Sequence, residues 1–219
     1  MKYLHNLVLH YYKNRDSSHG YSHVINVYNI SKMITKKIKK INKNELMKIK
    51  IGSLFHDAWD NKYIKNEKDI MEKKKELRND LKRINLNDED IDDIYIIIDN
   101  ISFTKEYNLI KNNKKLELFD LTLLRDIVSD SDKITSLGQG GIERIVIYEL
   151  NMNKIENIEF YIEKIKFLYE NRIKHMMKNN YIKTKEGKKI AIEKFNEMKK
   201  IMENEKMLYN IVNNVLNIK

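Results

Sequence analysis

Three short stretches of the sequence concentrate side chains that could bind a metal ion. They are HGYSH from His19 to His23, HDAWD from His56 to Asp60, and DSD from Asp130 to Asp132. The chain contains no cysteine, so a metal here would be held by imidazole, carboxylate or backbone oxygen. No single stretch is specific, because such short patterns also occur in chains that bind no metal. The residues around each stretch are therefore needed to decide whether it could bind a metal.

The pair His56-Asp57 ends an apolar run, IGSLF, that is expected in the core. Burying an ionised carboxylate beside an imidazole is costly unless a partner compensates, and a divalent cation suits both groups. Asp60 follows Asp57 by three residues and can face the same cavity from the same helix. The alternative interpretation is a capped helix end with a surface aspartate.

Similar arguments apply to the other two stretches. Asp130 and Asp132 follow the apolar-faced segment LTLLRDIV, and carboxylates at a helix C-terminus are mildly unfavourable unless a cation is near. A turn of small polar residues is the alternative there. His23 opens the segment VINVYNISKMI and shares its apolar face with Val27 and Ile30, where an imidazole without a partner is unusual. A polar helix start remains the alternative for this stretch.

Helices are expected to position these residues. The chain has no proline and only six glycines, and its apolar residues recur at steps of three and four, so the sequence predicts an all-α protein. The residues 137–141, LGQGG, are predicted to form a turn. Helices are predicted around residues 4–11, 24–41, 46–57, 66–83, 87–101, 117–130, 155–178 and 186–217.

Composition limits the partners and the compartment. With 42 Lys and Arg against 32 Asp and Glu, the net charge is +10, which would suit a nucleic acid, an anionic membrane or a phosphorylated small molecule. The basic residues are spread along the chain, so a solvated surface is the preferred interpretation. No apolar run is long enough for a transmembrane helix, and the N-terminus does not resemble a secretory signal. We expect a cytoplasmic protein.

The order of the motifs resembles that of the HD-domain metal-dependent phosphohydrolases, especially their small stand-alone bacterial members. The matching blocks are SHGYSHVINV, LFHDAWDNKY, DNISF, DSDKITSLGQGGIER and TKEGKKIA, which together span about residues 17–200. The resemblance implies one HD-type domain over residues 1–219, a helical bundle with its motifs in residues 15–145 and additional C-terminal helices in residues 153–217. Asn26 and Ile134-Thr135 depart from the family pattern, but neither departure removes a proposed ligand.

The resemblance implies a set of metal ligands. They are His23, His56, Asp57 and Asp132. Two imidazoles and two carboxylates suit one octahedral first-row divalent cation, which could be manganese, iron, nickel, cobalt or zinc. Magnesium is less favoured because two of the ligands are nitrogen atoms.

The resemblance also implies roles for neighbouring polar residues. Asp60 is expected to orient or deprotonate the attacking water, and His19 to contact phosphate or carry a proton without binding the metal. Lys62, Lys133 and Arg144 are expected to bind phosphate oxygens, and Arg144 also to brace the ligand helices.

The activity that follows is divalent-metal-dependent phosphohydrolysis, of class EC 3.1 or 3.6, by attack of metal-bound hydroxide on phosphorus. The expected substrate is a phosphorylated small molecule, with nucleotides first and nucleoside-triphosphate pyrophosphohydrolysis as the leading specific reaction. A nucleotide phosphatase or phosphodiesterase is one alternative. A non-catalytic basic protein that binds RNA or a nucleotide on an HD scaffold is another. Nucleic acid is not the favoured partner, a membrane is not expected, and a homo-oligomer is left open.

Overall fold

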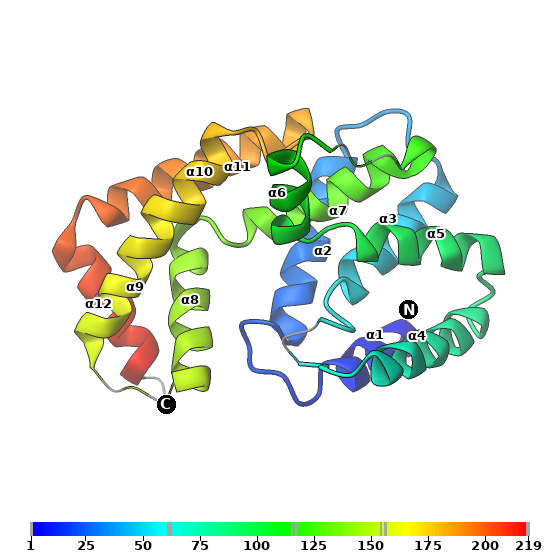
Figure 1. Ribbon diagram of the computed structural model, residues 1–219, viewed down its shortest axis with the longest axis horizontal. Helices are drawn as coiled ribbons and strands as arrows, with labels where there is room; N and C mark the ends of the chain where they lie inside the picture. The colour runs from blue at the N-terminus through cyan, green and yellow to red at the C-terminus, as the bar shows by residue number, and fades with distance from the viewer. Residues whose placement is uncertain are drawn as a thin grey trace.

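The computed structural model describes residues 2–60, 63–114, 116, 118–153, 155 and 157–217, and it is all-α as predicted (Figure 1). Its described residues contain no strand. In chain order the helices are α1 (Lys2–Tyr11), α2 (Tyr21–Thr35), α3 (Lys43–Phe55), α4 (Glu67–Lys82), α5 (Asp88–Asp99), α6 (Phe103–Lys111), α7 (Thr122–Ile134), α8 (Gly138–Asn153), α9 (Ile158–Leu168), α10 (Lys174–Lys178), α11 (Lys185–Met202) and α12 (Glu205–Asn217).

Side-chain caps account for where several helices begin. Asn42 accepts a hydrogen bond from the backbone of Glu45, whose side chain accepts one from the backbone of Asn42 in return. At the starts of α4, α5 and α11, the side chains of Asn66, Asn87 and Thr184 each accept one backbone hydrogen bond, without the reciprocal contact. The predicted starts of α4 and α5 at Asn66 and Asn87 are therefore confirmed.

Helix α7 differs from its predicted extent. A 3-10 turn, η1 (Phe119–Leu121), precedes it, and α7 continues past the predicted end at Asp130 as far as Ile134. The fully buried Ile134 packs in the core and extends the helix. The predicted first residue, Glu117, lies outside the described residues. Asp132 therefore belongs to the last helical turn of α7.

The glycine-rich segment was predicted as a turn, but most of it is helical. Only residues 135–137 separate α7 from α8, which begins at Gly138. Gly138 has a φ of +70°, in the left-handed region that favours glycine. An added Cβ on Gly141 would lie 2.2 Å from the carbonyl oxygen of Ser136. The two glycines thus allow the chain to reverse between two helices that both contribute to the site.

The C-terminal part contains more elements than its periodicity predicted. The segment predicted as one helix over residues 155–178 has a π-helical turn, η2 (Tyr169–Ile173), between α9 and α10. The segment predicted over residues 186–217 is interrupted at Glu203 and Asn204, which separate α11 from α12.

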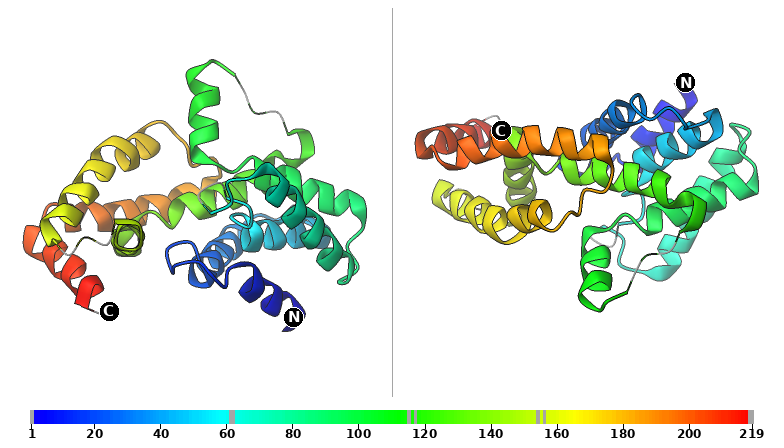
Figure 2. Two further views of the ribbon diagram at one scale, coloured as in Figure 1. Left: turned by 60° about the horizontal axis from the view of Figure 1, so that its bottom comes forward. Right: turned by 90° about the horizontal axis from the view of Figure 1, so that it is seen from above.

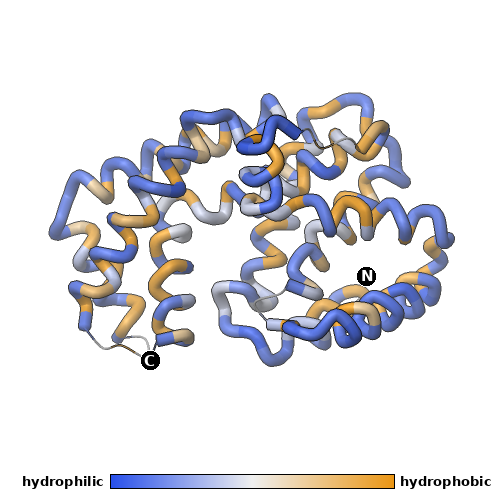
Figure 3. The backbone as a smooth tube through the Cα atoms, in the orientation of Figure 1, coloured by the Kyte–Doolittle hydropathy of each residue, from blue (hydrophilic) through white to orange (hydrophobic). Residues whose placement is uncertain are grey.

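Two apolar clusters stabilise the fold. One contains residues of α1, α2, α3, α4 and α5, and the other extends from α2 and α7 to α12. Helices α2, α3 and α5 contribute to both clusters, and apolar positions recur along each helix at helical spacing (Figure 3). Helix α7 packs against α2, α3 and α11 and so connects the two halves of the molecule (Figure 2). No described helix has the length and apolar character needed to cross a membrane.

Candidate metal centre

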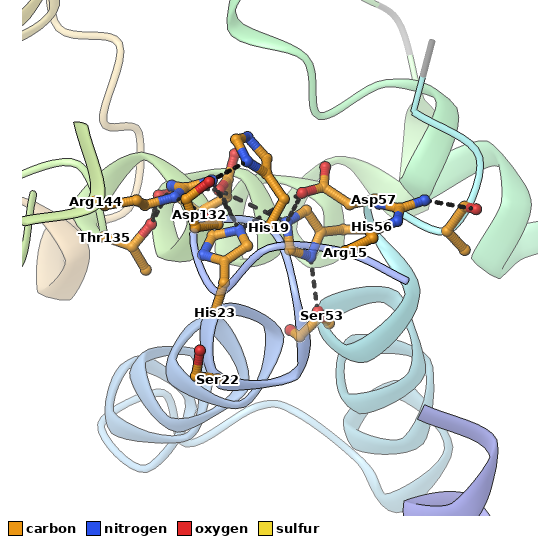
Figure 4. Close-up of polar contacts among 12 residues, drawn as sticks. Arg15, His19, Ser22, His23, Ser53, His56, Asp57, Asp132, Thr135 and Arg144 are labelled. Atoms are coloured by element: carbon orange, nitrogen blue, oxygen red, sulfur yellow. Dashed lines mark hydrogen bonds and ion pairs between the residues drawn. The ribbon is translucent and has the colours of Figure 1, made fainter. Parts of the chain in front are cut away.

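Three helices that pack against one another bring the four predicted ligands together. His23 lies in the first turn of α2, His56 and Asp57 directly follow α3, and Asp132 lies in the last turn of α7. Their side chains point toward a common centre (Figure 4). The predicted ligands, far apart in the sequence, are therefore neighbours in the fold.

The donor atoms have the spacing of ligands around one metal ion. The Nε2 atoms of His23 and His56 are 3.1 Å apart. Asp132 Oδ1 lies 3.4 Å from His23 Nε2, and Asp57 Oδ2 lies 3.4 Å from His56 Nε2. The two remaining imidazole–carboxylate distances are 3.6 Å. Bonds of about 2.1 Å to one ion would place adjacent octahedral ligands about 3.0 Å apart and tetrahedral ligands about 3.4 Å apart. The residues present therefore fit a divalent cation.

The orientation of His56 also suits metal binding. Its Nδ1 lies 2.8 Å from the carbonyl oxygen of Ser53, and an N–H donating to this oxygen leaves the Nε2 lone pair directed at the centre. His23 and His56 are both only 5% exposed, so water contributes little to holding either ring. A backbone hydrogen bond of this kind fixes the tautomer and the ring plane of a metal-binding imidazole.

Two ionised carboxylates face one protonated and one neutral imidazole, and a bound divalent cation would displace the proton on His56. Burial and the nearby Arg144 guanidinium lower the pKa of His23 to about 4, so this imidazole is neutral at pH 7. Burial opposes a charge on His56, but the Asp57 and Asp132 carboxylates outweigh it and raise its pKa to about 10. The imidazoles in turn overcome the effect of burial and hold the pKa values of both carboxyl groups below their usual range. Two partly buried carboxylates thus face the centre in ionised form.

Arg144 joins the elements that carry the ligands. From α8, its Nε donates to the carbonyl oxygen of Ser18 at 2.5 Å, and its Nη1 donates to Thr135 Oγ1 at 2.9 Å. Its Nη2 lies 3.1 Å from His23 Nε2, and its Nη1 lies 3.8 Å from Asp132 Oδ1. The structure shows the bracing expected of this residue, while its contact with phosphate stays a prediction.

His19 lies beside the four donors without joining them. Its ring centroid is 6.0 Å from that of His23 and 5.3 Å from that of Tyr148. Its Nδ1 is 2.8 Å from the hydroxyl of Ser18, which donates a short hydrogen bond to Asp16. Because the Ser18 hydroxyl donates to Asp16, His19 Nδ1 is the donor to Ser18 in this chain of hydrogen bonds. The sequence interpretation missed Asp16 and Ser18, although they stand directly before the HGYSH stretch.

The other predicted residues have different surroundings. Asp60 is half-buried and lines the same cavity as His56 and Asp57. Lys62 lies outside the described residues. Lys133 is 4% exposed, and its ammonium donates to Glu106 Oε2 at 2.6 Å and to the carbonyl oxygen of Tyr181 at 3.0 Å. Its predicted contact with phosphate stays a prediction, and the structure pairs its charge with a buried carboxylate.

Asp130 does not join the centre. Its carboxylate accepts hydrogen bonds from the backbone N–H groups of Lys183 and Thr184 and from the Thr184 hydroxyl, at 2.7–2.9 Å. Gly187 permits this contact, because an added Cβ would lie 2.8 Å from Asp130 Oδ2. Asp130 therefore ties the start of α11 to α7, and only the second aspartate of the DSD stretch faces the candidate metal centre.

A cavity of about 1150 Å³ opens beside the centre. Its wall includes His19, His56, Asp57, Asp60, Asp132 and Arg144, together with aromatic and basic residues from α6, α8 and η2. Ligand sites of drug-sized molecules occupy about 300–1000 Å³, so the cavity has room for a nucleotide-sized molecule.

Comparisons with known proteins support the fold. No protein-family model and no curated protein matches the chain. A Lactobacillus plantarum protein, solved as a Northeast Structural Genomics target, is 17% identical, with a TM-score of 0.65 over 95% of this chain and 96% of that chain. The Lin1889 protein of Listeria innocua is 22% identical, with a TM-score of 0.62 over 91% of this chain and 89% of that chain. At these identities the likeness establishes a shared all-helical fold over nearly the whole chain.

Proposed function

We propose that this protein is a divalent-metal-dependent phosphohydrolase of the HD-domain type. The observation that carries the proposal is the convergence of the His23 and His56 Nε2 atoms on each other and on Asp57 and Asp132 oxygens, at 3.1–3.6 Å. Of these four residues, His56, Asp57 and Asp132 line a large cavity. The proposed substrate is a phosphorylated small molecule. Nucleotides are the first class to test, and nucleoside-triphosphate pyrophosphohydrolysis is the leading specific reaction.

The site supports this assignment because its charged ligands lie beside a cavity that can admit substrate. His23, His56 and Asp57 would hold the cation, with Asp132, whose Oδ1 lies 3.4–3.6 Å from the two imidazoles, as the fourth ligand. The cavity side of the site is then left for water and substrate. When bound, a divalent cation would acidify water and neutralise charge on a phosphoryl group.

The remaining polar residues supply binding and proton transfer. Asp60, in the cavity wall, orients the attacking water and accepts its proton. Arg144 keeps the ligand elements together and offers positive charge beside Asp132. His19 lines the cavity with its Nδ1 held by Ser18, and its proposed role is to exchange a proton with a leaving oxygen.

The test is a substrate screen with products resolved by phosphorus NMR. The full chain, loaded with manganese or cobalt, is incubated with nucleoside mono-, di- and triphosphates and with cyclic and linear phosphodiesters. We expect turnover of at least one nucleotide and its loss in Asp57→Ala. Asp69→Ala, an exposed aspartate in α4, is the matched control and should behave as the parent protein.

The products distinguish the alternatives. Release of pyrophosphate indicates the pyrophosphohydrolase, release of inorganic phosphate indicates a phosphatase, and opening of an ester indicates a phosphodiesterase. If no phosphate ester or anhydride is hydrolysed, and Asp57→Ala leaves the affinity for RNA unchanged, the enzyme proposal is wrong and the non-catalytic binding protein replaces it.

A further inference from the structure

A second arginine lies in the wall of the same cavity. Arg172, in the π-helical turn η2, lines the cavity together with Arg144 and with the ligands His56, Asp57 and Asp132. Its side chain remains accessible to water, as expected in a wide cavity. Neither composition nor motif spacing distinguished this residue from the many other basic residues of the chain.

Arg172 differs from the other arginines in its contacts. Within the part of the chain that the structure describes, it has no carboxylate at ion-pair distance and no hydrogen-bond acceptor. The five other arginines all have such partners, and these arginines are Arg15, Arg78, Arg83, Arg125 and Arg144. The donors of the Arg172 guanidinium are therefore available to a ligand.

Phe103 holds the guanidinium in place without neutralising it. The Arg172 Cζ atom lies 5.1 Å from the centroid of the Phe103 ring, which is a cation–π distance. Phe103 opens α6, and its ring packs at 4.9 Å against that of Tyr181. An aromatic face orients a guanidinium but accepts none of its N–H groups in the way a carboxylate would. The phenylalanine of the DNISF block, Phe103, therefore lies against the Arg172 guanidinium.

The π-helical turn keeps one face of the helix toward the cavity. Residues 164, 168, 172 and 176 all line it, at a constant spacing of four. Around an α-helix with 3.6 residues per turn, that spacing drifts steadily in one direction. The wider π turn at Tyr169–Ile173 counters the drift, and such turns often occur at functional sites. Arg172 therefore lies near the middle of the cavity-facing stripe.

The charges of the metal centre act on Arg172. Partial removal from water inside the cavity lowers the pKa of the Arg172 guanidinium, the Asp132 carboxylate raises it, and the Arg144 guanidinium lowers it. Lys164 and Lys105, which also line the cavity, have local partners. Lys164 pairs with Glu149 at 3.2 Å, and Lys105 donates to Asn100 and to the Asp99 carbonyl oxygen. Arg172 thus adds an uncommitted positive charge on the cavity side of the centre.

We propose that Arg172 binds a second anionic group of the substrate, beyond the phosphoryl group at the metal centre, and thereby selects polyphosphate chains over monophosphates. This inference rests on the proposed function for the position of the first phosphoryl group. A guanidinium fork that is already oriented matches the paired oxygens of a phosphate group. Arg144 and Arg172 would then contact successive parts of one phosphate chain.

The experiment measures binding by calorimetry. Inorganic phosphate and tripolyphosphate are each titrated into the full chain, with one equivalent of manganese and in metal-free form. Arg172→Gln should weaken tripolyphosphate binding by at least about tenfold, because a charged hydrogen-bonding group is lost. The affinity for inorganic phosphate should change by less than about threefold, because a single phosphate group would bind at the metal centre. Arg172→Lys, which keeps the charge but loses the fork, should give an intermediate tripolyphosphate affinity.

The control is Arg83→Gln, which removes an arginine that pairs with Asp80 outside the cavity and should leave both affinities unchanged. The proposal is overturned if Arg172→Gln leaves tripolyphosphate binding unchanged or weakens both anions by the same factor. If the protein binds no manganese, the proposed function fails, and the metal-free titrations still decide the role of Arg172. If nucleotides are hydrolysed but anion selectivity is unchanged in Arg172→Gln, only the inference on Arg172 fails.

Discussion

The Nε2 atoms of His23 and His56 lie 3.1 Å apart, although 33 positions separate the residues in the chain. One imidazole comes from the start of α2 and the other from the end of α3, and the two helices pack directly against each other. Asp132 reaches the same centre from α7, which packs on both helices. The site consequently depends on the relative positions of three helices, and it can be tested through its ligands, its braces and its supporting turns.

Loss of His23 should abolish metal binding more severely than loss of His19. His23 Nε2 is among the converging donors, whereas His19 contacts Ser18 and lies outside that group. Replacing a residue that orients a metal ligand typically lowers metal affinity or activity by about 10–100-fold, and replacing the ligand itself lowers metal affinity more. We expect His23→Ala to lose more than about a hundredfold in metal affinity, and His19→Ala less than about tenfold while turnover slows. Elemental analysis after dialysis measures the metal content of both variants, and an activity assay measures turnover. Equal metal loss in the two variants would contradict the assignment.

Removing the metal should destabilise the fold, because only the folded chain brings the ligands together. A ligand at a hundred times its dissociation constant adds about 2.7 kcal/mol of stability. In a chain of this size we expect chelation to lower Tm by about 5–10 °C, as measured by differential scanning calorimetry. Asp57→Ala should unfold at the same temperature with and without the chelator. A chelator effect as large in that variant as in the parent protein would place the metal elsewhere.

Arg144→Lys should weaken the site although the charge is kept. The guanidinium of Arg144 reaches Ser18, Thr135 and His23 at once, and an ammonium on a single stem cannot repeat this geometry. We expect a loss of about 1–3 kcal/mol in the free energy of unfolding and weaker metal binding. Arg83→Lys, at a largely exposed arginine away from the site, is the control and should change little. Similar losses of stability in both variants would show that Arg144 does not brace the site.

Two adjacent glycines should respond oppositely to alanine. A Cβ on Gly141 would lie 2.2 Å from the carbonyl oxygen of Ser136, so Gly141→Ala must displace the backbone between α7 and α8. A Cβ on Gly140 would meet nothing within 4 Å. We expect Gly141→Ala to cost at least about 2 kcal/mol in chemical denaturation and Gly140→Ala to stabilise α8 by about 0.5–1 kcal/mol. A neutral Gly141→Ala would show that the close approach is not required.

The buried Glu106 should make stability depend on pH. Burial opposes its ionisation, but Lys133, Arg125 and Lys183 outweigh this effect and lower the pKa of its carboxyl group. A lowered folded-state pKa contributes stability that is present above the unfolded value of about 4.3 and is lost as pH falls through the folded value.

We therefore expect Glu106→Gln to cost about 2–4 kcal/mol in the free energy of unfolding at pH 7. The difference from the parent protein should narrow below about pH 4, where the parent loses its carboxylate. Urea denaturation across this range measures the difference, and Glu163→Gln, on the partly exposed surface of α9, is the control. A difference that stays constant from pH 7 to pH 3 would contradict the charge network.

The sequence alone was sufficient for much of the helical architecture, and it supplied the candidate site residues. Apolar spacing predicted the all-α class, and Asn66 and Asn87 marked the starts of α4 and α5. These signals are local, since a cap or a helical turn involves residues within about four positions of one another. Motif order singled out His23, His56, Asp57 and Asp132 before their distances were known.

Only the tertiary structure decided which polar groups meet. The sequence does not show that Glu106 pairs with Lys133, or that Phe103 carries the guanidinium of Arg172. It likewise placed the end of α7 four residues too early, because the burial of Ile134 depends on packing against other helices. Such contacts join residues tens of positions apart, and their free energies depend on the relative placement of whole helices. Motif order therefore predicted the candidate ligands, and helix packing determined the geometry in which they meet.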